Sequence, residues 1–301
     1  MQPSPIAHIG ILVADLETSR ERWAKVLAGT FSPITRYRPE NWSDRGNPTP
    51  HLHDARLTFY LGDAPSIEIL EFVGNGTHSP DKGEGGHHLS FPPLEDNSRR
   101  REELAELGIG IDGEIRHDGR WIFQFAEAEA LNNVYTEWVE EHPDHPDVKD
   151  DLSPINRMPD GTKTLFDLET IRSLPAGRPS SRIVEIGVEV RDVSAARVRW
   201  ETVTRYDFTP DRDGSYVGGV APALIRLFAS TPSSREGLAY AVIETDDLSA
   251  TAERLEASDI PFRAMEENGR TVGGTTIAVD REYLNGFELR FVSVSPPWHG
   301  Q

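Results

Sequence analysis

Two histidines, His8 and His88, are the residues of this sequence best placed to do chemistry together. Each lies near the start of a short apolar segment, 6–13 or 86–93, that has the pattern of a buried strand. Each segment is followed by a polar stretch and then by a helical pattern. The repeated order predicts two copies of one small unit, each directing an imidazole into a shared site, and imidazole is a common metal ligand.

Composition limits the chemistry of such a site. The chain has 301 residues, no cysteine and a formal net charge of −19. Without thiolates, a metal must be held by histidine and carboxylate. The negative charge argues against nucleic acid or an anionic membrane as a partner. Because the sequence has neither a basic-apolar leader nor a run of roughly 18 apolar residues, we expect a cytoplasmic protein.

A longer repeat indicates that a whole domain occurs twice. Segment 183–193 follows the pattern of 6–16 without a gap, and Trp200 stands where Trp23 does, an offset of 177 residues (200 − 23). Between the repeats, 142–180 is rich in Pro, Asp and Gly. The predicted organisation is a first domain at 1–141, a linker at 142–180 and a second domain at 181–301.

Three motifs carry a family resemblance: AHIGILVADL (7–16), IEILEFVG (67–74) and GEGGHHLSF (83–91). Together they resemble the vicinal oxygen chelate superfamily of glyoxalases, methylmalonyl-CoA epimerases, extradiol dioxygenases and antibiotic-resistance binding proteins. The resemblance implies an α+β fold of tandem glyoxalase-like domains. Four βαβββ units would form two curled eight-stranded mixed sheets with helices outside, the first domain binding metal and the second, degenerate domain lacking it.

The resemblance also implies a ligand set. In the family, a metal in the trough of the curled sheet is held from the first, fourth, fifth and eighth strands, which here correspond to His8, Glu68, His88 and Glu137. Such a set suits one divalent ion of Mn, Fe, Co, Ni or Zn and leaves positions for substrate oxygens. Glu71 competes with Glu68, because the two carboxylates, three residues apart, face opposite sides of a strand.

The second domain has lost these ligands together. The equivalent positions are Glu185, Arg226, Tyr240 and Arg290. This set cannot chelate a cation, so we expect either a structural ion cluster or an anion-binding pocket there.

Further residues are candidates for substrate contact. The polar, irregular segment 38–53 is expected to be a loop over the open end of the trough, as lids often are. Trp42 and His53 in this segment, together with Tyr60, are candidate substrate-binding residues. His87 follows a different expectation: as the strand neighbour of His88 it should face the opposite side and be structural or solvent-facing.

These features favour a metal-dependent isomerase, epimerase or lyase. It would act on a small oxygenated carbonyl substrate through a metal-stabilised enediolate, with Glu68 or Glu137 as base. One alternative is an extradiol-type dioxygenase, although its site usually lies in the second domain, which lacks ligands here. Another is a binding protein that sequesters a ligand in the trough. A small-molecule substrate and a monomer or homodimer are expected.

Overall fold

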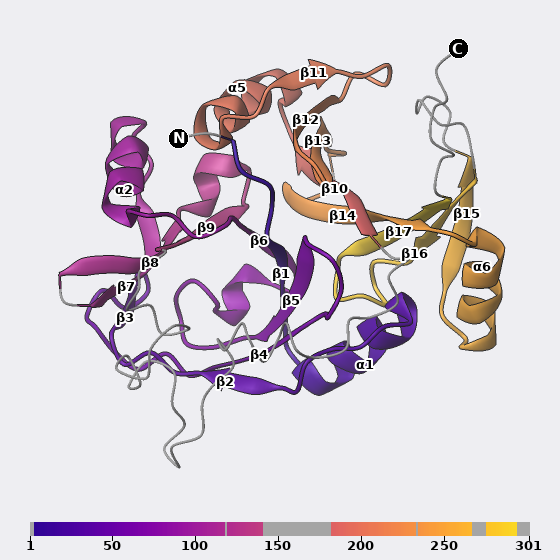
Figure 1. Ribbon diagram of the computed structural model, residues 1–301, viewed down its shortest axis with the longest axis horizontal. Helices are drawn as coiled ribbons and strands as arrows, with labels where there is room; N and C mark the ends of the chain where they lie inside the picture. The colour runs from indigo at the N-terminus through magenta and orange to yellow at the C-terminus, as the bar shows by residue number, and fades with distance from the viewer. Residues whose placement is uncertain (1–2, 118, 141–181, 233, 267–274, 294–301) are drawn as a thin grey trace.

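The computed structural model describes residues 3–117, 119–140, 182–232, 234–266 and 275–293. The predicted linker, 142–180, therefore lies outside the described residues. Within them, the chain forms two curled mixed sheets, each with two helices against it (Figure 1). No helix in the described ranges is long and apolar enough to cross a membrane.

The first sheet is built from residues 8–139 and has the strand order β2-β4-β5-β1-β6-β9-β8-β7-β3. At its centre, β1 pairs in parallel with β5 and antiparallel with β6, which pairs in parallel with β9. Its strands are β1 (His8–Val13), β2 (Thr35–Tyr37), β3 (Trp42–Asp44), β4 (Ala55–Phe59), β5 (Ser66–Glu71), β6 (Gly85–Ser90), β7 (Ile111–His117), β8 (Arg120–Ala126) and β9 (Tyr135–Val139). Its helices are α1 (Leu16–Leu27) and α2 (Asn97–Glu106), with short 3-10 turns η1 (Pro80–Lys82) and η2 (Ala128–Leu131).

The second sheet repeats this plan with eight strands in the order β11-β12-β13-β10-β14-β17-β16-β15. Its strands are β10 (Arg182–Val190), β11 (Phe208–Pro210), β12 (Tyr216–Val220), β13 (Ala223–Ala229), β14 (Gly237–Thr245), β15 (Phe262–Glu266), β16 (Thr275–Val279) and β17 (Glu288–Ser293). Its helices are α5 (Val193–Thr204) and α6 (Leu248–Ala257). The predicted tandem glyoxalase-like α+β architecture is confirmed.

The first sheet differs from the prediction by one strand. Trp42–Asp44 lies inside the segment predicted to be an open loop, yet it forms β3 and pairs with β7, with Trp42 opposite Ile115. Trp42 is fully buried among aromatic side chains from β8, including Phe123. Burial of the indole explains why this polar segment forms an edge strand instead of a lid. The prediction of a loop over the trough is wrong at these residues.

Equivalent caps begin the first helix of each half. In α1, the Asp15 carboxylate accepts a hydrogen bond from the Thr18 N–H at 2.9 Å, and in α5 Asp192 does the same for Ala195. Such caps satisfy backbone donors that the first helical turn leaves free. Each helix then buries a tryptophan, Trp23 or Trp200, against its sheet. The sequence repeat thus reflects a repeat of local structure.

The two halves are joined by reciprocal hydrogen bonds. The Asn132 amide accepts from Trp200 Nε1 at 3.1 Å and donates to Glu236 Oε1 at 3.0 Å. In the reciprocal set, the Asn285 amide accepts from Trp23 Nε1 at 3.4 Å and donates to Glu84 Oε1 at 3.1 Å. Strand β6 also contacts β14 across this boundary. These bonds fix β6, which carries His88, against the second half.

Candidate metal centre

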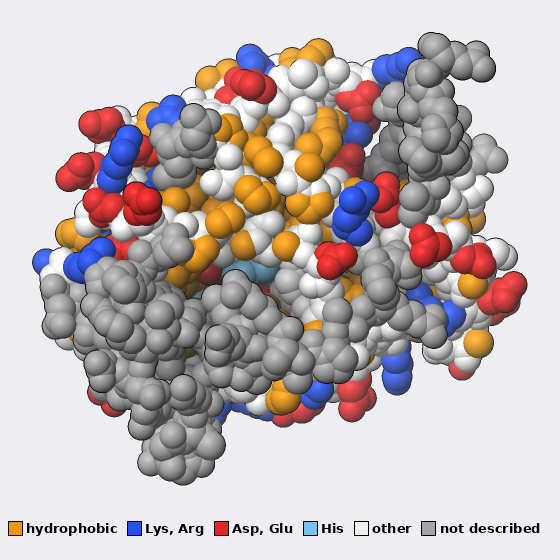
Figure 2. Space-filling model, viewed as in Figure 1, with side chains coloured by type: hydrophobic (Ala, Val, Ile, Leu, Met, Phe, Trp, Pro, Cys, Tyr) orange, Lys and Arg blue, Asp and Glu red, His pale blue; other side chains and the backbone are white. Residues whose placement is uncertain are grey.

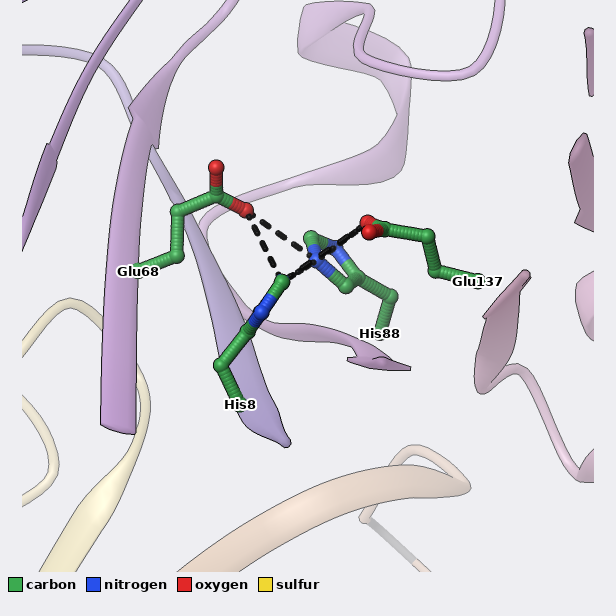
Figure 3. A group of neighbouring side chains, drawn as sticks. All are labelled: His8, Glu68, His88 and Glu137. Carbon is green, nitrogen blue, oxygen red and sulfur yellow. Dashed lines mark hydrogen bonds and ion pairs between the residues drawn. The ribbon is translucent and has the colours of Figure 1, made fainter. Parts of the chain in front are cut away.

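Four side chains converge in the trough of the first sheet: His8, Glu68, His88 and Glu137 (Figure 3). They come from β1, β5, β6 and β9, which are adjacent in the sheet. One donor atom from each lies within 4.8 Å of the donor atoms of the others. The structure therefore brings together, from positions far apart in the sequence, the four residues that the resemblance implied.

The spacing of these atoms fits a single ion. The two imidazole Nε2 atoms lie 3.1 Å apart, and His88 Nε2 lies 3.1 Å from Glu68 Oε2 and 3.2 Å from Glu137 Oε2. The matching distances from His8 Nε2 are 3.6 and 3.7 Å. Donors about 2.1 Å from one ion, at angles of about 90–110°, lie about 3.0–3.4 Å from each other. The five distances that involve a histidine are therefore within a few tenths of an ångström of those expected around one divalent cation.

Gly10 makes room for the His88 ring. Gly10 lies opposite His88 in the pairing of β1 with β6. A Cβ atom at Gly10 would stand 1.9 Å from His88 Cε1, which is far inside van der Waals contact. Gly187 has the same relation to the Tyr240 ring in the second half, at 2.1 Å. Gly10, two residues after His8 on the same strand, is therefore needed for the His88 ring to reach its position in the site.

Glu71, the competing carboxylate, lies elsewhere. Its side chain pairs with Arg56 at 3.0 Å and accepts a hydrogen bond from the Leu16 N–H at 3.4 Å. It therefore stabilises the start of α1 on the other face of the sheet, whereas Glu68 is 4% exposed and lies beside the histidines.

Comparison with known proteins rests on structure, since no family model and no curated protein matches the sequence. A mutant of 4-hydroxymandelate synthase from Streptomyces coelicolor superposes with a TM-score of 0.62 and 10% identity, over 97% of this chain and 93% of that one. A catechol 2,3-dioxygenase superposes with a TM-score of 0.58 and 12% identity, over 100% of this chain and 91% of that one. For a halotolerant catechol dioxygenase the TM-score is 0.53 and the identity 9%, again over 100% of this chain and 91% of that one. This chain has the vicinal oxygen chelate fold.

The second half keeps the vicinal oxygen chelate fold with a different cluster in its trough. Glu185 Oε1 accepts hydrogen bonds from Arg226 Nε and Tyr240 Oη, both at 3.0 Å, and the Arg290 guanidinium lies 3.6 Å from the Tyr240 ring centroid. Arg226 also pairs with Asp211 at 2.7 Å. Burial lowers the pKa of Arg226, but the carboxylates outweigh this effect and raise it. Carboxylates therefore neutralise Arg226 in an ion cluster, and an anion-binding role for the same trough stays a prediction.

The three residues expected to contact substrate are buried, and none of them belongs to the four-residue cluster. Trp42 and His53 stack with ring centroids 4.3 Å apart and are both buried. Tyr60 packs against Phe31 in the core on the outer side of the sheet. The strand alternation explains this position, because the neighbouring Phe59 is the residue that faces the trough, with its ring 5.4 Å from that of His8.

Two phenylalanines that the sequence analysis missed border the cluster. Phe59 lies beside His8, and the Phe125 ring on β8 lies 5.1 Å from that of His88. An aromatic surround lowers the local dielectric and strengthens electrostatic interactions within the cluster. The strand alternation was the available signal for Phe59. No local sequence signal pointed to Phe125, because its contact with His88 depends on how the sheet brings β8 close to β6.

Burial and ion pairing act against each other on the four pKa values. Burial lowers the pKa of His8, but Glu137 and Glu68 raise it to about 10, and His88 is raised for the same reason. Burial raises the pKa of both carboxyls, yet the two imidazoles outweigh it and lower the pKa of Glu68 and Glu137. Without an ion, the cluster therefore favours protonated imidazoles beside ionised carboxylates, and His8 is protonated at neutral pH.

A divalent ion must displace these protons, so its binding should depend steeply on pH. We expect at least one proton, that of His8, to be released per ion at pH 7, and affinity to rise as pH increases from 6 to 8, because the ion and the proton compete for the same nitrogens. Titration calorimetry of metal-stripped protein in buffers of different ionisation enthalpy measures the release. His8→Gln should release about one proton fewer. An affinity independent of pH would contradict the charge assignment.

Proposed function

We propose that this chain is a metal-dependent isomerase, epimerase or lyase, which moves a proton at a carbon next to a carbonyl in a small oxygenated substrate. The observation that carries the proposal is the convergence of two imidazoles and two carboxylates on one point, with spacing that fits a divalent ion. An ion held by His8, Glu68, His88 and Glu137 would act as a Lewis acid on neighbouring substrate oxygens. The rest of the chemistry falls to the two carboxylates.

The two glutamates differ in how firmly they are held. Glu137 Oε1 accepts a hydrogen bond from Ser90 Oγ at 3.0 Å, which fixes the carboxylate while Oε2 faces the histidines. For Glu68, Oε2 faces the histidines and the other oxygen points away from the cluster (Figure 3). Among the described residues, none donates a hydrogen bond to that second oxygen. Glu68 is therefore the better placed of the two to accept and return a substrate proton.

Substrate access is proposed at His8. The side chain of His8 is 13% exposed, compared with 6% for Glu68 and Glu137 and 1% for His88. Figure 2 shows a histidine side chain in a recess of the visible face, beside a group of hydrophobic side chains. As the most exposed of the four, His8 is the residue that a substrate would meet first, and the Phe59 ring lies 5.4 Å from its ring. This geometry suits a small molecule with one polar end and one apolar end.

Deuterium exchange tests the proposal. Protein loaded with Zn²⁺, Mn²⁺, Co²⁺ or Ni²⁺ is incubated in D₂O with a panel of small 2-hydroxycarbonyl compounds, and the signal of the hydrogen next to the carbonyl is followed by NMR. We expect metal-dependent loss of that signal for at least one compound, and no loss with His88→Ala. Metal-dependent binding of these compounds without exchange would instead favour a sequestering protein.

A dioxygenase is the second candidate, and one observation favours it. The solved structures that match over the whole chain include two named as catechol dioxygenases. Two histidines and one carboxylate can also hold non-haem Fe²⁺, so three of the four residues would suffice. The fourth ligand argues against it, because it occupies a position that a dioxygenase needs. Fe²⁺-loaded protein with catechol should therefore consume no oxygen above the rate without protein, and sustained uptake would favour the dioxygenase.

A further inference from the structure

His87 is held on the same side of the sheet as His88 by an irregularity in β6. In the pairing with β1, Gly10 faces His88 whereas Ile11 faces Gly86, so His87 is an extra, bulged residue. The expectation that His87 faces away from the site is therefore wrong. The side chain is buried, at 5% exposure, and its ring lies 5.2 Å from that of His88.

Two hydrogen bonds determine where the protons of these rings lie. His87 Nε2 is 2.9 Å from the Thr77 carbonyl oxygen, and His87 Nδ1 is 2.9 Å from His88 Nδ1. A carbonyl only accepts, so His87 Nε2 carries a proton and donates it. A neutral His87 then has a bare Nδ1, which accepts from the Nδ1–H of His88. Consequently, neutral His88 has its lone pair on Nε2, the atom that faces Glu68 and Glu137.

The opposite arrangement would block the metal centre. A proton on His87 Nδ1 would require His88 Nδ1 to accept. Neutral His88 would then carry its proton on Nε2, where an ion should bind. The Thr77 carbonyl, which can only accept, thus determines which nitrogen of His87 is protonated, and His87 in turn determines this for His88.

Strand β3, which was not predicted, helps to hold the Thr77 carbonyl in place. Asp44, the last residue of β3, accepts hydrogen bonds from the Trp42 indole at 2.8 Å and from the Thr77 N–H at 3.4 Å. The segment that carries the Thr77 carbonyl is therefore tied to the edge of the sheet. Burial of Trp42 and orientation of His87 are connected through one carboxylate.

The second half provides an internal comparison. Its strand β14 has the same irregularity, because Gly187 faces Tyr240 whereas Val188 faces Leu238. The bulged residue there is Ala239. The half without metal ligands thus keeps the bulge and lacks the imidazole on it. This is the pattern expected when the bulged histidine serves the metal ligand rather than the fold.

We infer that His87 is a positioning residue, which fixes the tautomer and ring orientation of His88 so that Nε2 is free to bind a divalent ion. The inference rests on the proposed metal centre. Histidine ligands commonly donate their second N–H to an acceptor, and loss of that acceptor weakens metal binding about 10–100-fold. Here the acceptor is a second imidazole instead of a carboxylate.

Metal affinity of matched variants tests this role. In competition with a chromogenic chelator, His87→Leu should bind Zn²⁺ about 10–100-fold more weakly than wild type. His87→Asn, whose amide oxygen can stand near the position of Nδ1 and accept from His88, should recover most of that loss. Tyr240→Phe changes a buried ring at the position equivalent to His88 in the second half and should leave affinity unchanged. Equal affinity of His87→Leu and wild type, or no recovery in His87→Asn, would overturn the inference.

Nitrogen-15 NMR of the wild-type chain gives a test that requires no variant to fold or to bind metal. His87 should carry a proton on Nε2 alone, with and without Zn²⁺, and His88 should be protonated on Nδ1. A proton on His87 Nδ1 would overturn the inference even if zinc binds. Failure of the wild-type chain to bind any divalent ion would instead refute the metal centre, and the His87 tautomer would still be read directly.

Discussion

His88→Ala is expected to weaken binding of a divalent ion about 100- to 1000-fold. Four protein ligands together contribute roughly 10–16 kcal/mol to zinc binding, so one ligand corresponds to about 2.5–4 kcal/mol. His88 is 1% exposed in its side chain and lies 3.1–3.2 Å from both carboxylates, so no solvent-exposed group can replace it. Competition with a chelator measures the change.

Tyr240→Phe is the matched control, because Tyr240 occupies the position of His88 in the second half. It removes one hydrogen bond to Glu185 and should leave metal affinity at the wild-type value. Circular dichroism and thermal unfolding show whether each variant is folded. A folded His88→Ala protein that binds zinc as tightly as wild type would exclude His88 as a ligand.

Glu68→Gln should separate proton transfer from metal binding. An amide oxygen can still ligate an ion, but it cannot accept a proton as a base does. In metal-saturated protein we expect the rate of deuterium exchange to fall about 10²–10⁴-fold, the usual contribution of a general base. The measurement uses the 2-hydroxycarbonyl compound that wild type exchanges fastest.

Glu137→Gln is the comparison for this variant. Its oxygen is held by Ser90, so we assign Glu137 to holding the ion rather than moving the proton. Saturating metal should therefore keep its exchange rate within about tenfold of wild type. A larger loss in Glu137→Gln than in Glu68→Gln would reverse the assignment of the base.

The sequence was sufficient to predict the plan of the fold. The repeat at an offset of 177 residues carries its own structural signals, an aspartate cap followed by a buried tryptophan, and both recur in α1 and α5. His8 and His88 were predicted from the two similar strands. Glu68 and Glu137 came from the family resemblance, because a glutamate in a strand has no local mark that separates a ligand from a surface residue.

Other features depend on contacts between distant segments. β3 is three residues long in a stretch rich in proline, and its partner β7 lies about 70 residues away. The bulge at His87 reverses the side that strict alternation assigns. In both cases tertiary packing overrides the local pattern.

The loss of the metal ligands in the second half was predictable from the sequence, but the set of contacts that replaces them was not. Residue types alone left an ion cluster and an anion pocket open. The ion pair between Arg226 and Asp211, at 2.7 Å, could not be predicted, because Asp211 is not one of the positions that correspond to the metal ligands. The second half therefore contributes the packing surface of β14 against β6 and the reciprocal asparagine bonds.

Metal stoichiometry tests the central claim most directly. Metal-stripped wild-type protein is saturated with Zn²⁺, freed of excess ion and analysed for metal per chain. We expect one ion per chain, and none in the double variant His8→Ala/His88→Ala. No bound ion in wild type, two ions per chain, or an ion retained by the double variant would contradict a single metal centre in the first half of the chain.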